Sequence, residues 1–370
     1  MQCYLVARAV HVLSLGVILG RTELLADVEH GLECLRGPLR DAERDGWTSF
    51  PGGGEKLAYD HAFVLLAAAT ATAAAAAGAR ELLEQALEVW EARFWDESAG
   101  AVVDRWDRAW QVLDGYRGAN ANMHTVEALL AVADVMPERA AVLRDRAERM
   151  VRRFVHDEAR TRDWRLPEHF DAQWTALPHF GKDDPSDPFR PYGVTVGHQF
   201  EWARLCLHLE AALADQAPGW LRTDAVALYA AAERRGWRAD GQDGFVYTLD
   251  WEDQPVVSAR MHWVLAEAIA AASVLGSVTG LPSYRTQGQV WAAHAAKHFV
   301  DEATGCWHHE LDPDGTPAAG TWSGQPDTYH VFQALLLTRL PVRGSVAAAL
   351  IVALPRPGTT VGGASSTGLY

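Results

Sequence analysis

Six alanine- and leucine-rich segments of this sequence, each with the composition of a helix, carry a histidine at or near their start. Successive histidines lie roughly 50 to 75 residues apart, at His11, His61, His124, His198, His262 and His330. That spacing fits a helix, a loop, a second helix and another loop, which together make one helical hairpin. Hairpins that cannot bury their apolar faces alone must stack or close on themselves, so six of them predict a ring. If the histidine-led helices form its inner wall, the six imidazoles face one common cavity.

The composition excludes several classes of partner. The sequence has 48 acidic and 33 basic residues and a net charge of −15, which repels phosphate backbones and anionic lipid. We therefore expect neither a nucleic acid nor a membrane as a partner. The four cysteines, Cys3, Cys34, Cys206 and Cys306, form no CxxC pair. This usage indicates a reducing compartment and predicts a cytoplasmic protein.

The apolar stretch near the N-terminus has the position of a signal peptide but not its other features. Arg8 is the only charge before it, and no small-residue cleavage site follows. No uninterrupted apolar run reaches the ~18 residues that a membrane span needs, and SVAAALIVAL after Gly344 is also too short. Residues 355–370 are rich in Gly, Ser, Thr and Pro and predict a disordered tail.

Two irregular stretches interrupt the helical pattern. The longer one, between His156 and Gly197, is rich in aromatic residues, prolines and charges. Long ordered loops are often functional, and this one fits a lid over a sugar ring as well as it fits an aromatic-pinned surface loop. The second stretch, 305–327, has the pattern of two strands joined by a turn at 312–315.

Seven segments carry a resemblance to a known family. They are AYDHAFVLLA, NANMHTVEALL, EHFDAQW, DPFRPYGVTVGHQFEWARL, FVYTLDW, RMHWVLAEA and WSGQPDTYHVFQALLLTRLP. In this order they resemble the N-acylglucosamine 2-epimerase family, and most closely its branch of mannose isomerases and related aldose–ketose isomerases. The resemblance runs from about Tyr4 to Pro341 and is more specific for the family than for the substrate.

The resemblance implies a fold, a reaction and a site. The fold is an all-α (α/α)6 barrel, with short β-hairpin loops over its mouth. The reaction is a metal-free interconversion of the aldose and ketose forms of a free sugar of the mannose and fructose type, through ring opening and an enediolate. The residues that match catalytic positions are His198, His330 and Glu201, and those that match substrate-contacting positions are Arg8, Asn120, His124, Arg190, His262 and Trp263.

Elementary chemistry fits these assignments. Moving a carbonyl between C1 and C2 requires a base for the C2 proton and an acid for the carbonyl oxygen, and histidine serves as either near pH 7. A fixed cation such as Arg8 or Arg190 stabilises the negative charge that develops on oxygen. His198 and Glu201 lie at i and i+3 on one helix face, so we expect the carboxylate to set the tautomer or raise the pKa of His198. The alternative is that His198 and Glu201 form an ordinary side-chain pair on the helix surface.

We expect no cofactor. Single histidines on separate helices lack the HExxH or HxH spacing that presents two metal ligands from one helix, so we also expect no metal. The expected partner is a small-molecule sugar, and the protein is expected to be a monomer or a homodimer.

The sequence departs from the family in two places. Because the first histidine-led helix begins almost at residue 1, we expect the first outer helix to be missing, which leaves part of the face of Val6, Val10, Leu13 and Val17 in water. The C-terminal apolar run is the alternative cover for that face. We assign residues 1–341 to the barrel and 342–370 to a C-terminal apolar segment and tail. Gln325 stands where relatives often have lysine.

Other functions stay open. The first alternative is a sugar 2-epimerase of the N-acylglucosamine or cellobiose type. An (α/α)6 glycoside hydrolase needs paired carboxylates, whereas the inner positions here carry histidine. An inactive sugar-binding homologue is the third alternative. The sequence does not identify the sugar, because such substrates differ by loop contacts of ~1–3 kcal/mol.

Overall fold

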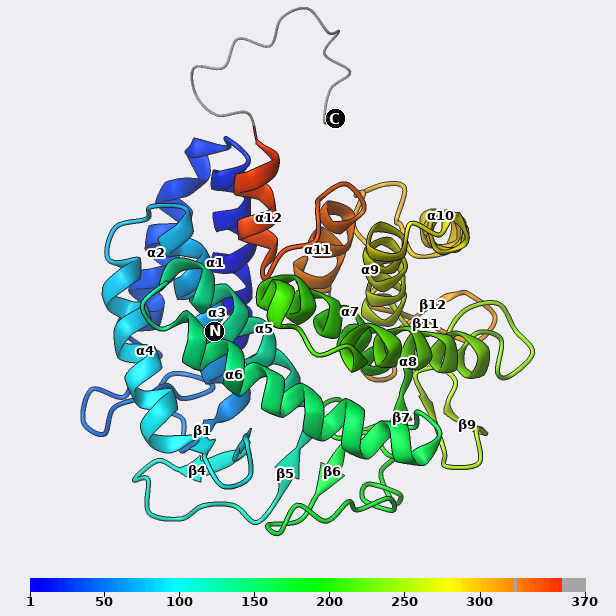
Figure 1. The fold of residues 1–370 in the computed structure, drawn as a ribbon, viewed down its shortest axis with the longest axis horizontal. Coiled ribbons are helices and arrows are strands. Elements are labelled where there is room, and N and C mark those ends of the chain that lie inside the picture. The colour runs from blue at the N-terminus through cyan, green and yellow to red at the C-terminus, as the bar shows by residue number, and fades with distance from the viewer. Residues whose placement is uncertain (323–324, 355–370) are drawn as a thin grey trace, which may run out of the picture.

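The computed structural model describes residues 1–322 and 325–354, whose regular structure is mainly helical (Figure 1). Six of these helices form an inner ring: α1 (Cys3–Ile18), α3 (Ala58–Ala73), α5 (Ala119–Val135), α7 (Val196–Leu213), α9 (His262–Thr279) and α11 (Tyr329–Leu337). Each contacts the next along the chain, and α11 contacts α1 as well as α9. The architecture is of the predicted (α/α)6 type.

Five further helices pack against the outside of this ring: α2 (Leu25–Arg36), α4 (Ala79–Arg93), α6 (Ala140–Val151), α8 (Trp220–Gly236) and α10 (Pro282–His298). Each packs on the inner helix that precedes it in the sequence. These outer helices are amphipathic, as α4 illustrates: Leu82 and Trp90 are buried, whereas Glu81 and Glu88 are exposed. A π-helical segment (Arg152–Ala159) and a 3-10 turn (Arg160–Arg162) prolong α6, and shorter 3-10 turns lie at Thr22–Leu24 and Ala214–Gln216.

The inner helices are apolar nearly all round, because the ring interior and the outer helices cover both of their faces. Helix α9 is long and apolar enough, by length and composition alone, to cross a membrane. We expected no segment of that length from uninterrupted apolar runs. Averaged over 18 residues, the hydropathy of α9 is high enough although polar residues such as Glu267 interrupt the run. Within the fold, 72% of α9 is buried, as expected for a core helix.

Short antiparallel strands cover the end of the ring where the inner helices begin. Four strands directly precede α3, α5, α7 and α9, namely β1 (Glu55–Leu57), β5 (Arg117–Gly118), β7 (Val194–Thr195) and β10 (Arg260–Met261). Their respective partners are β4 (Arg105–Asp107), β6 (His169–Phe170), β8 (Thr248–Leu249) and β11 (Glu310–Leu311). Strand β9 (Pro255–Val257) adds to β8, β12 (Pro317–Ala318) adds to β11, and a separate hairpin joins β2 (Trp95–Asp96) to β3 (Ala101–Val102). The predicted hairpin within 305–327 is β11–β12.

A short helix, α12 (Val346–Ala353), packs across the opposite end of the ring and contacts α1, α3, α5 and α11 (Figure 1). The Ser345 hydroxyl caps it: the oxygen accepts from the Ala348 N–H at 3.2 Å and the hydroxyl donates to Asp134 of α5 at 2.7 Å. The apolar C-terminal segment therefore closes this end. The predicted tail, 355–370, lies outside the described residues, and the division between 341 and 342 stays a prediction.

The expected exposure of α1 is observed only in part. Val10 is buried, because α2 packs closely there: a Cβ on Gly31 would lie 2.3 Å from Val10 Cγ2. The expectation was wrong for this residue. Val6, Leu13 and Val17 are partly exposed. Leu5 is also 37% exposed, so an apolar strip of α1 remains in contact with water.

Candidate active site

A cavity of about 380 Å³ opens at the end of the ring where the inner helices begin. All six inner helices contribute side chains to its wall: Arg8 (α1), Tyr59 (α3), Asn120 and His124 (α5), His198 and Glu201 (α7), His262 and Trp263 (α9) and His330 (α11). This set contains every predicted site residue except Arg190. The ring therefore brings together side chains that are hundreds of residues apart in the sequence.

Two of the six helix-leading histidines do not reach the cavity, so the expectation that all six face it was wrong. His11 lies two turns into α1, where its Nδ1 bonds to the Thr70 hydroxyl at 2.8 Å. His61 points outward: its Nδ1 donates to the Leu57 carbonyl at 2.7 Å and its Nε2 accepts from the Trp47 N–H at 3.1 Å. Burial lowers the pKa of His61 to about 3 and that of His11 to about 4. Both are neutral packing residues.

His198, on the first turn of α7, is held by a glutamate from a distant loop. Its Nδ1 lies 3.0 Å from Oε1 of Glu168, which directly precedes β6. This corrects our expectation that Glu201 sets the tautomer of His198. Because Glu168 occupies Nδ1, Nε2 is the nitrogen that serves the cavity.

His330, on the first turn of α11, has the same arrangement. Its Nδ1 lies 2.9 Å from Oε1 of Glu267, a buried residue of α9. Burial lowers the pKa of His330, although Glu267 opposes the shift. His330 is therefore a neutral base near pH 7 whose Nε2 serves the cavity.

Trp263 contacts both of these histidines. Its ring centroid is 5.2 Å from that of His198 and 5.6 Å from that of His330, and both pairs are tilted. His262 beside it bonds through Nδ1 to the His309 carbonyl at 2.9 Å. The predicted aromatic wall thus packs against two imidazoles whose Nδ1 atoms are each bound to a glutamate.

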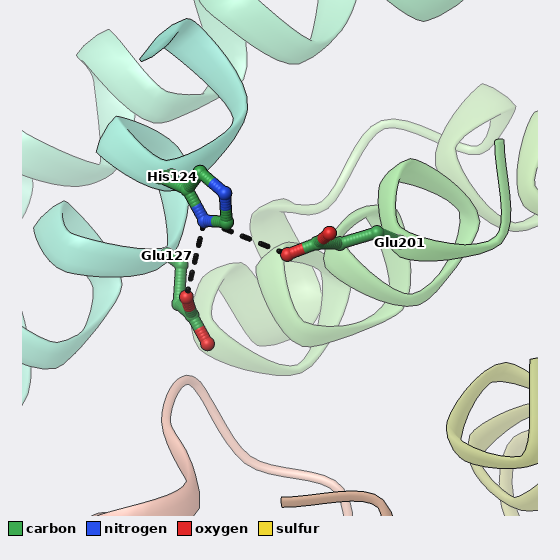
Figure 2. A group of neighbouring side chains, drawn as sticks. All are labelled: His124, Glu127 and Glu201. Carbon is green, nitrogen blue, oxygen red and sulfur yellow. Dashed lines mark ion pairs between the residues drawn. The ribbon is translucent and has the colours of Figure 1, made fainter. Parts of the chain in front are cut away.

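A cluster of buried carboxylates lies beneath the cavity. Figure 2 shows His124 and Glu127 of α5 and Glu201 of α7 pointing toward one another. His124 Nδ1 is 3.8 Å from Glu127 Oε2 and 3.6 Å from Glu201 Oε1. Burial, together with the nearby Glu267, raises the pKa of Glu201 well above its ordinary value. Glu201 therefore favours its protonated form more strongly than an exposed glutamate does.

Arg8 reaches the cavity as an already paired cation. One guanidinium nitrogen donates to Asp327 Oδ2 at 2.9 Å and another to the Tyr59 hydroxyl at 2.9 Å. The guanidinium also lies 4.4 Å from the ring centroid of Phe63. These contacts fix its direction, so it presents a rigid positive group to the cavity.

Arg190 does not line this cavity. Its guanidinium is 3.6 Å from Asp104 and 4.1 Å from the ring centroid of Tyr116, and it lines a second cavity of about 200 Å³. Tyr59 and Asn120 line both cavities. The prediction that Arg190 contacts substrate in the main cavity is therefore not supported by its position.

Only part of the long loop reaches the site. Phe189 lines the main cavity and packs against Trp322 at 5.4 Å and Tyr59 at 6.0 Å between ring centroids. His169 instead bonds to the Tyr116 hydroxyl at 2.7 Å and stays behind the wall. The lid interpretation is therefore limited to the segment around Phe189, while Glu168 of the same loop holds His198.

Two groups of side chains bring potential metal ligands together within the described residues. They are His124, Glu127 and Glu201, and Glu201, Glu267 and His330, with ligand atoms within 4.8 Å of one another. Sequence spacing does not reveal these groups, because their members come from different helices. Arg204 already supplies a positive charge to all three glutamates. The absence of a metal requirement stays a prediction.

Sequence reasoning missed the glutamates that hold the two histidines, and Arg204 below them. It also missed Glu127, for which the sequence does contain a signal: His124 and Glu127 repeat the i, i+3 spacing of His198 and Glu201. No local spacing identifies Glu168 or Glu267, because each reaches its histidine from another element.

An (α/α)6 ring whose mouth combines two glutamate-bound histidines with a fixed arginine supplies the acid, base and positive charge that a sugar isomerase or epimerase uses. Residues 1–334 match the sequence model of the N-acylglucosamine 2-epimerase (GlcNAc 2-epimerase) family. The chain belongs to this family and is an isomerase or epimerase.

Individual relatives agree with this assignment. The chain is 53% identical over 354 residues to a D-mannose isomerase from Thermobifida fusca, which covers 94% of this chain and 86% of the relative. A D-mannose isomerase crystal structure superposes with a TM-score of 0.84 at 23% identity, covering 96% of this chain and 88% of the other. A cellobiose 2-epimerase from Spirochaeta thermophila DSM 6192 superposes with a TM-score of 0.77 at 21% identity, covering 91% and 85%. At these identities the two structures are evidence for the fold alone.

Proposed function

We propose that this protein is an aldose–ketose isomerase that interconverts D-mannose and D-fructose without a metal. The observation that carries the proposal is the pair His198 and His330, each with Nδ1 bound to a buried glutamate and each flanking Trp263 in the cavity wall. The 53% identity to a D-mannose isomerase supports the choice of sugar.

The proposed mechanism uses His330 as the base at carbon. Nε2 of His330 removes the proton from C2 of the open-chain aldose, and the electron pair of that C–H bond forms the C1=C2 double bond. The carbonyl oxygen on C1 takes a proton from His198, which gives an enediol. His198 then removes the proton on O2 while His330 returns its proton to C1, and the ketose carbonyl forms at C2. Arg8 stabilises negative charge on the sugar oxygens during both steps.

The charges in the cavity favour a neutral sugar. Arg8 is the only lysine or arginine in the described wall, and Asp327 pairs with it at 2.9 Å. Gln325, which also lines the cavity, is uncharged. A phosphorylated or sulfonated sugar would have to bind without an unpaired cation, which is costly in a partly dry site.

C2 epimerisation is the second candidate, and the same two histidines favour it. If His198 lies on the sugar face opposite His330, it can return a proton to C2 rather than relay one between O1 and O2. Hydrolysis is less well supported, because an inverting hydrolase needs two carboxylates about 6.5–9.5 Å apart with a water between them. Here Glu127, Glu201 and Glu267 gather around one arginine.

Incubation with D-mannose in deuterated water, followed by NMR, tests the proposal. We expect D-fructose to appear as the first product. Formation of D-glucose before any ketose would favour the epimerase, and turnover of cellobiose in preference to mannose would favour a cellobiose-type epimerase. Binding of mannose with no conversion would identify an inactive sugar-binding homologue. The cytoplasmic location and the oligomeric state stay predictions.

A further inference from the structure

Arg204 is an arginine of α7 with almost no access to water, less than one turn beyond Glu201, which lines the cavity. Its side chain is 1% exposed, and it is absent from the cavity wall. It lies six residues after His198 on the same helix. A buried charge of this kind is costly unless other charges compensate for it, so its partners explain why it is there.

Those partners are three glutamates from three inner helices. Nε of Arg204 donates to Oε2 of Glu267 (α9) at 3.0 Å. Its Nη2 lies 3.6 Å from Oε1 of Glu201 (α7), and its Nη1 lies 4.0 Å from Oε1 of Glu127 (α5). The planar guanidinium thus directs a different nitrogen toward each carboxylate.

Each of these glutamates in turn contacts a group at the cavity. The other oxygen of Glu267 binds His330 Nδ1 at 2.9 Å. Glu127 accepts a hydrogen bond from the Tyr329 hydroxyl and lies 3.8 Å from His124. Glu201 itself lines the cavity. Arg204 is therefore one contact away from three parts of the site without touching the space where substrate binds.

The pKa values of the three carboxylates shift in different directions although all three are buried. Burial raises the pKa of Glu267, but Arg204 and His330 outweigh it and the net pKa lies below its ordinary value. In Glu127 burial is likewise outweighed, by His124 and Arg204. The pKa of Glu201 is raised instead, by burial and by Glu267. Arg204 thus favours the ionised forms of Glu127 and Glu267, whereas Glu201 favours its protonated form.

We propose that Arg204 is a positioning residue for proton transfer, which holds Glu267 as an ionised and correctly oriented partner of His330. The proposal rests on the proposed function, in which His330 is the base at carbon. The titratable groups that face Arg204 from the surrounding helices also enter the test: Glu127, Glu201, Glu267, His208 and Tyr329.

The test compares three substitutions. Arg204→Lys keeps the positive charge but loses the planar guanidinium and its several N–H donors, whereas Arg204→Gln and Arg204→Met remove the charge. Arg235→Met is the matched control, because Arg235 has a 6% exposed side chain paired with Asp163 and Asp253, outside the cavity wall. Each substitution removes the ion pairs of a nearly buried arginine, but only Arg204 contacts a partner of His330.

We expect kcat to fall about 10- to 100-fold in Arg204→Gln with KM nearly unchanged, less than the ~10²–10⁴-fold contribution of a general base. Loss of a positive charge makes the remaining cluster bind protons more tightly, so the acidic limb of the kcat profile moves to higher pH. Arg204→Lys should leave that limb in place. Arg235→Met should lose stability with neither change.

A second readout needs no substrate. In protein with ¹³C-labelled histidine, the pH at which the His330 signal titrates should rise in Arg204→Gln and stay unchanged in Arg204→Lys and Arg235→Met. An unchanged His330 titration in Arg204→Gln, or equal limb shifts in Lys and Gln variants, would overturn the proposal. If the wild type converts no sugar while the His330 titration moves as expected, the proposed function fails and the role of Arg204 stands. If Arg204→Gln and Arg204→Met do not fold, the Lys variant decides: a displaced titration of His330 in that folded, charge-retaining protein contradicts the proposal.

Discussion

Gly197 and Trp263 pack so closely that a Cβ on the glycine would lie 2.3 Å from Cζ3 of the tryptophan. Gly197 directly precedes His198, and Trp263 contacts both His198 and His330. The absence of a side chain at position 197 is therefore what allows the indole to pack against both imidazoles.

We expect Gly197→Ala to displace Trp263 and misplace His198. A shift of about 1 Å near reacting groups can cost about 100-fold, so kcat/KM should fall between about 10- and 100-fold. Overpacking should also lower the unfolding free energy by about 1–3 kcal/mol. Gly219→Ala is the matched control, because no atom lies within 4 Å of a Cβ built there. Wild-type kinetics in Gly197→Ala would show that the position of Trp263 does not matter for turnover.

Replacement of either cavity histidine should stop turnover without unfolding the protein. General acid and base groups contribute about 10²–10⁴-fold, and we expect losses of that size in His198→Ala and in His330→Ala. Steady-state kinetics and circular dichroism measure the two effects separately. His30→Ala, at a side chain that is 77% exposed on α2, should behave as wild type. More than a tenth of wild-type activity in either cavity variant, with an unchanged spectrum, contradicts the proposed mechanism.

Much of this site could be predicted, because the helical period and the repeated histidines are local properties. Whether the side chains of His11 and His61 face the cavity could not be predicted. Each residue turns an α-helix by about 100°, so His61 faces away from the cavity that Tyr59, two residues earlier, lines. The exact start of α3 decides which of the two points inward, and the sequence pattern defines helix ends only within a residue or two.

The supporting glutamates were harder to predict for a different reason. Glu168 reaches His198 from a loop 30 residues earlier, and Glu267 reaches His330 from another helix 63 residues earlier. Arg204 lies in an otherwise apolar segment of α7, where sequence patterns favour an exposed charge. Only the assembled ring shows that this arginine lies among three buried glutamates.

Chelation should leave activity unchanged. The proposed chemistry moves protons between sugar atoms and imidazoles, and Arg204 and Arg8 supply the positive charges near the site. Activity would be measured after prolonged EDTA treatment and dialysis. The experiment can contradict the prediction, because two groups of His and Glu side chains in the site could hold a metal ion. Loss of activity that Mn²⁺ or Zn²⁺ restores would assign one of those groups to a metal.

The protein should lose stability as the pH falls below about 6.5, because burial lowers the pKa of several histidines. It is lowered to about 3 in His61, His124 and His262, and to about 4 in His11 and His208. Between the ordinary value of about 6.5 and these values, the unfolded chain binds more protons than the folded one, so the unfolding free energy decreases as the pH falls.

Each such histidine contributes up to about 1.4 kcal/mol per pH unit in that window. Asp60 and Asp104 act in the opposite direction, since burial raises the pKa of each to about 6, but they are outnumbered. Urea unfolding at pH 7 and pH 5 measures the difference. His61→Gln should flatten the dependence and the exposed His30→Gln should not. Equal stability at both pH values would mean that the buried histidines are protonated in the fold.

The amides of α1 should exchange with solvent faster than those of α7. Leu5 of α1 is 37% exposed and Val6, Leu13 and Val17 are partly exposed, whereas residues 200–209 of α7 are all buried. Exposed apolar surface contributes nothing of the ~25 cal/mol per Å² that burial supplies, so local opening of α1 costs less free energy. Hydrogen exchange by mass spectrometry, combined with light scattering for the oligomeric state, measures both properties. Slow exchange over residues 5–18 in a dimer would show that a second copy covers the strip. The same slow exchange in a monomer would contradict the prediction, and α12, which already contacts α1, would then be the element that protects it.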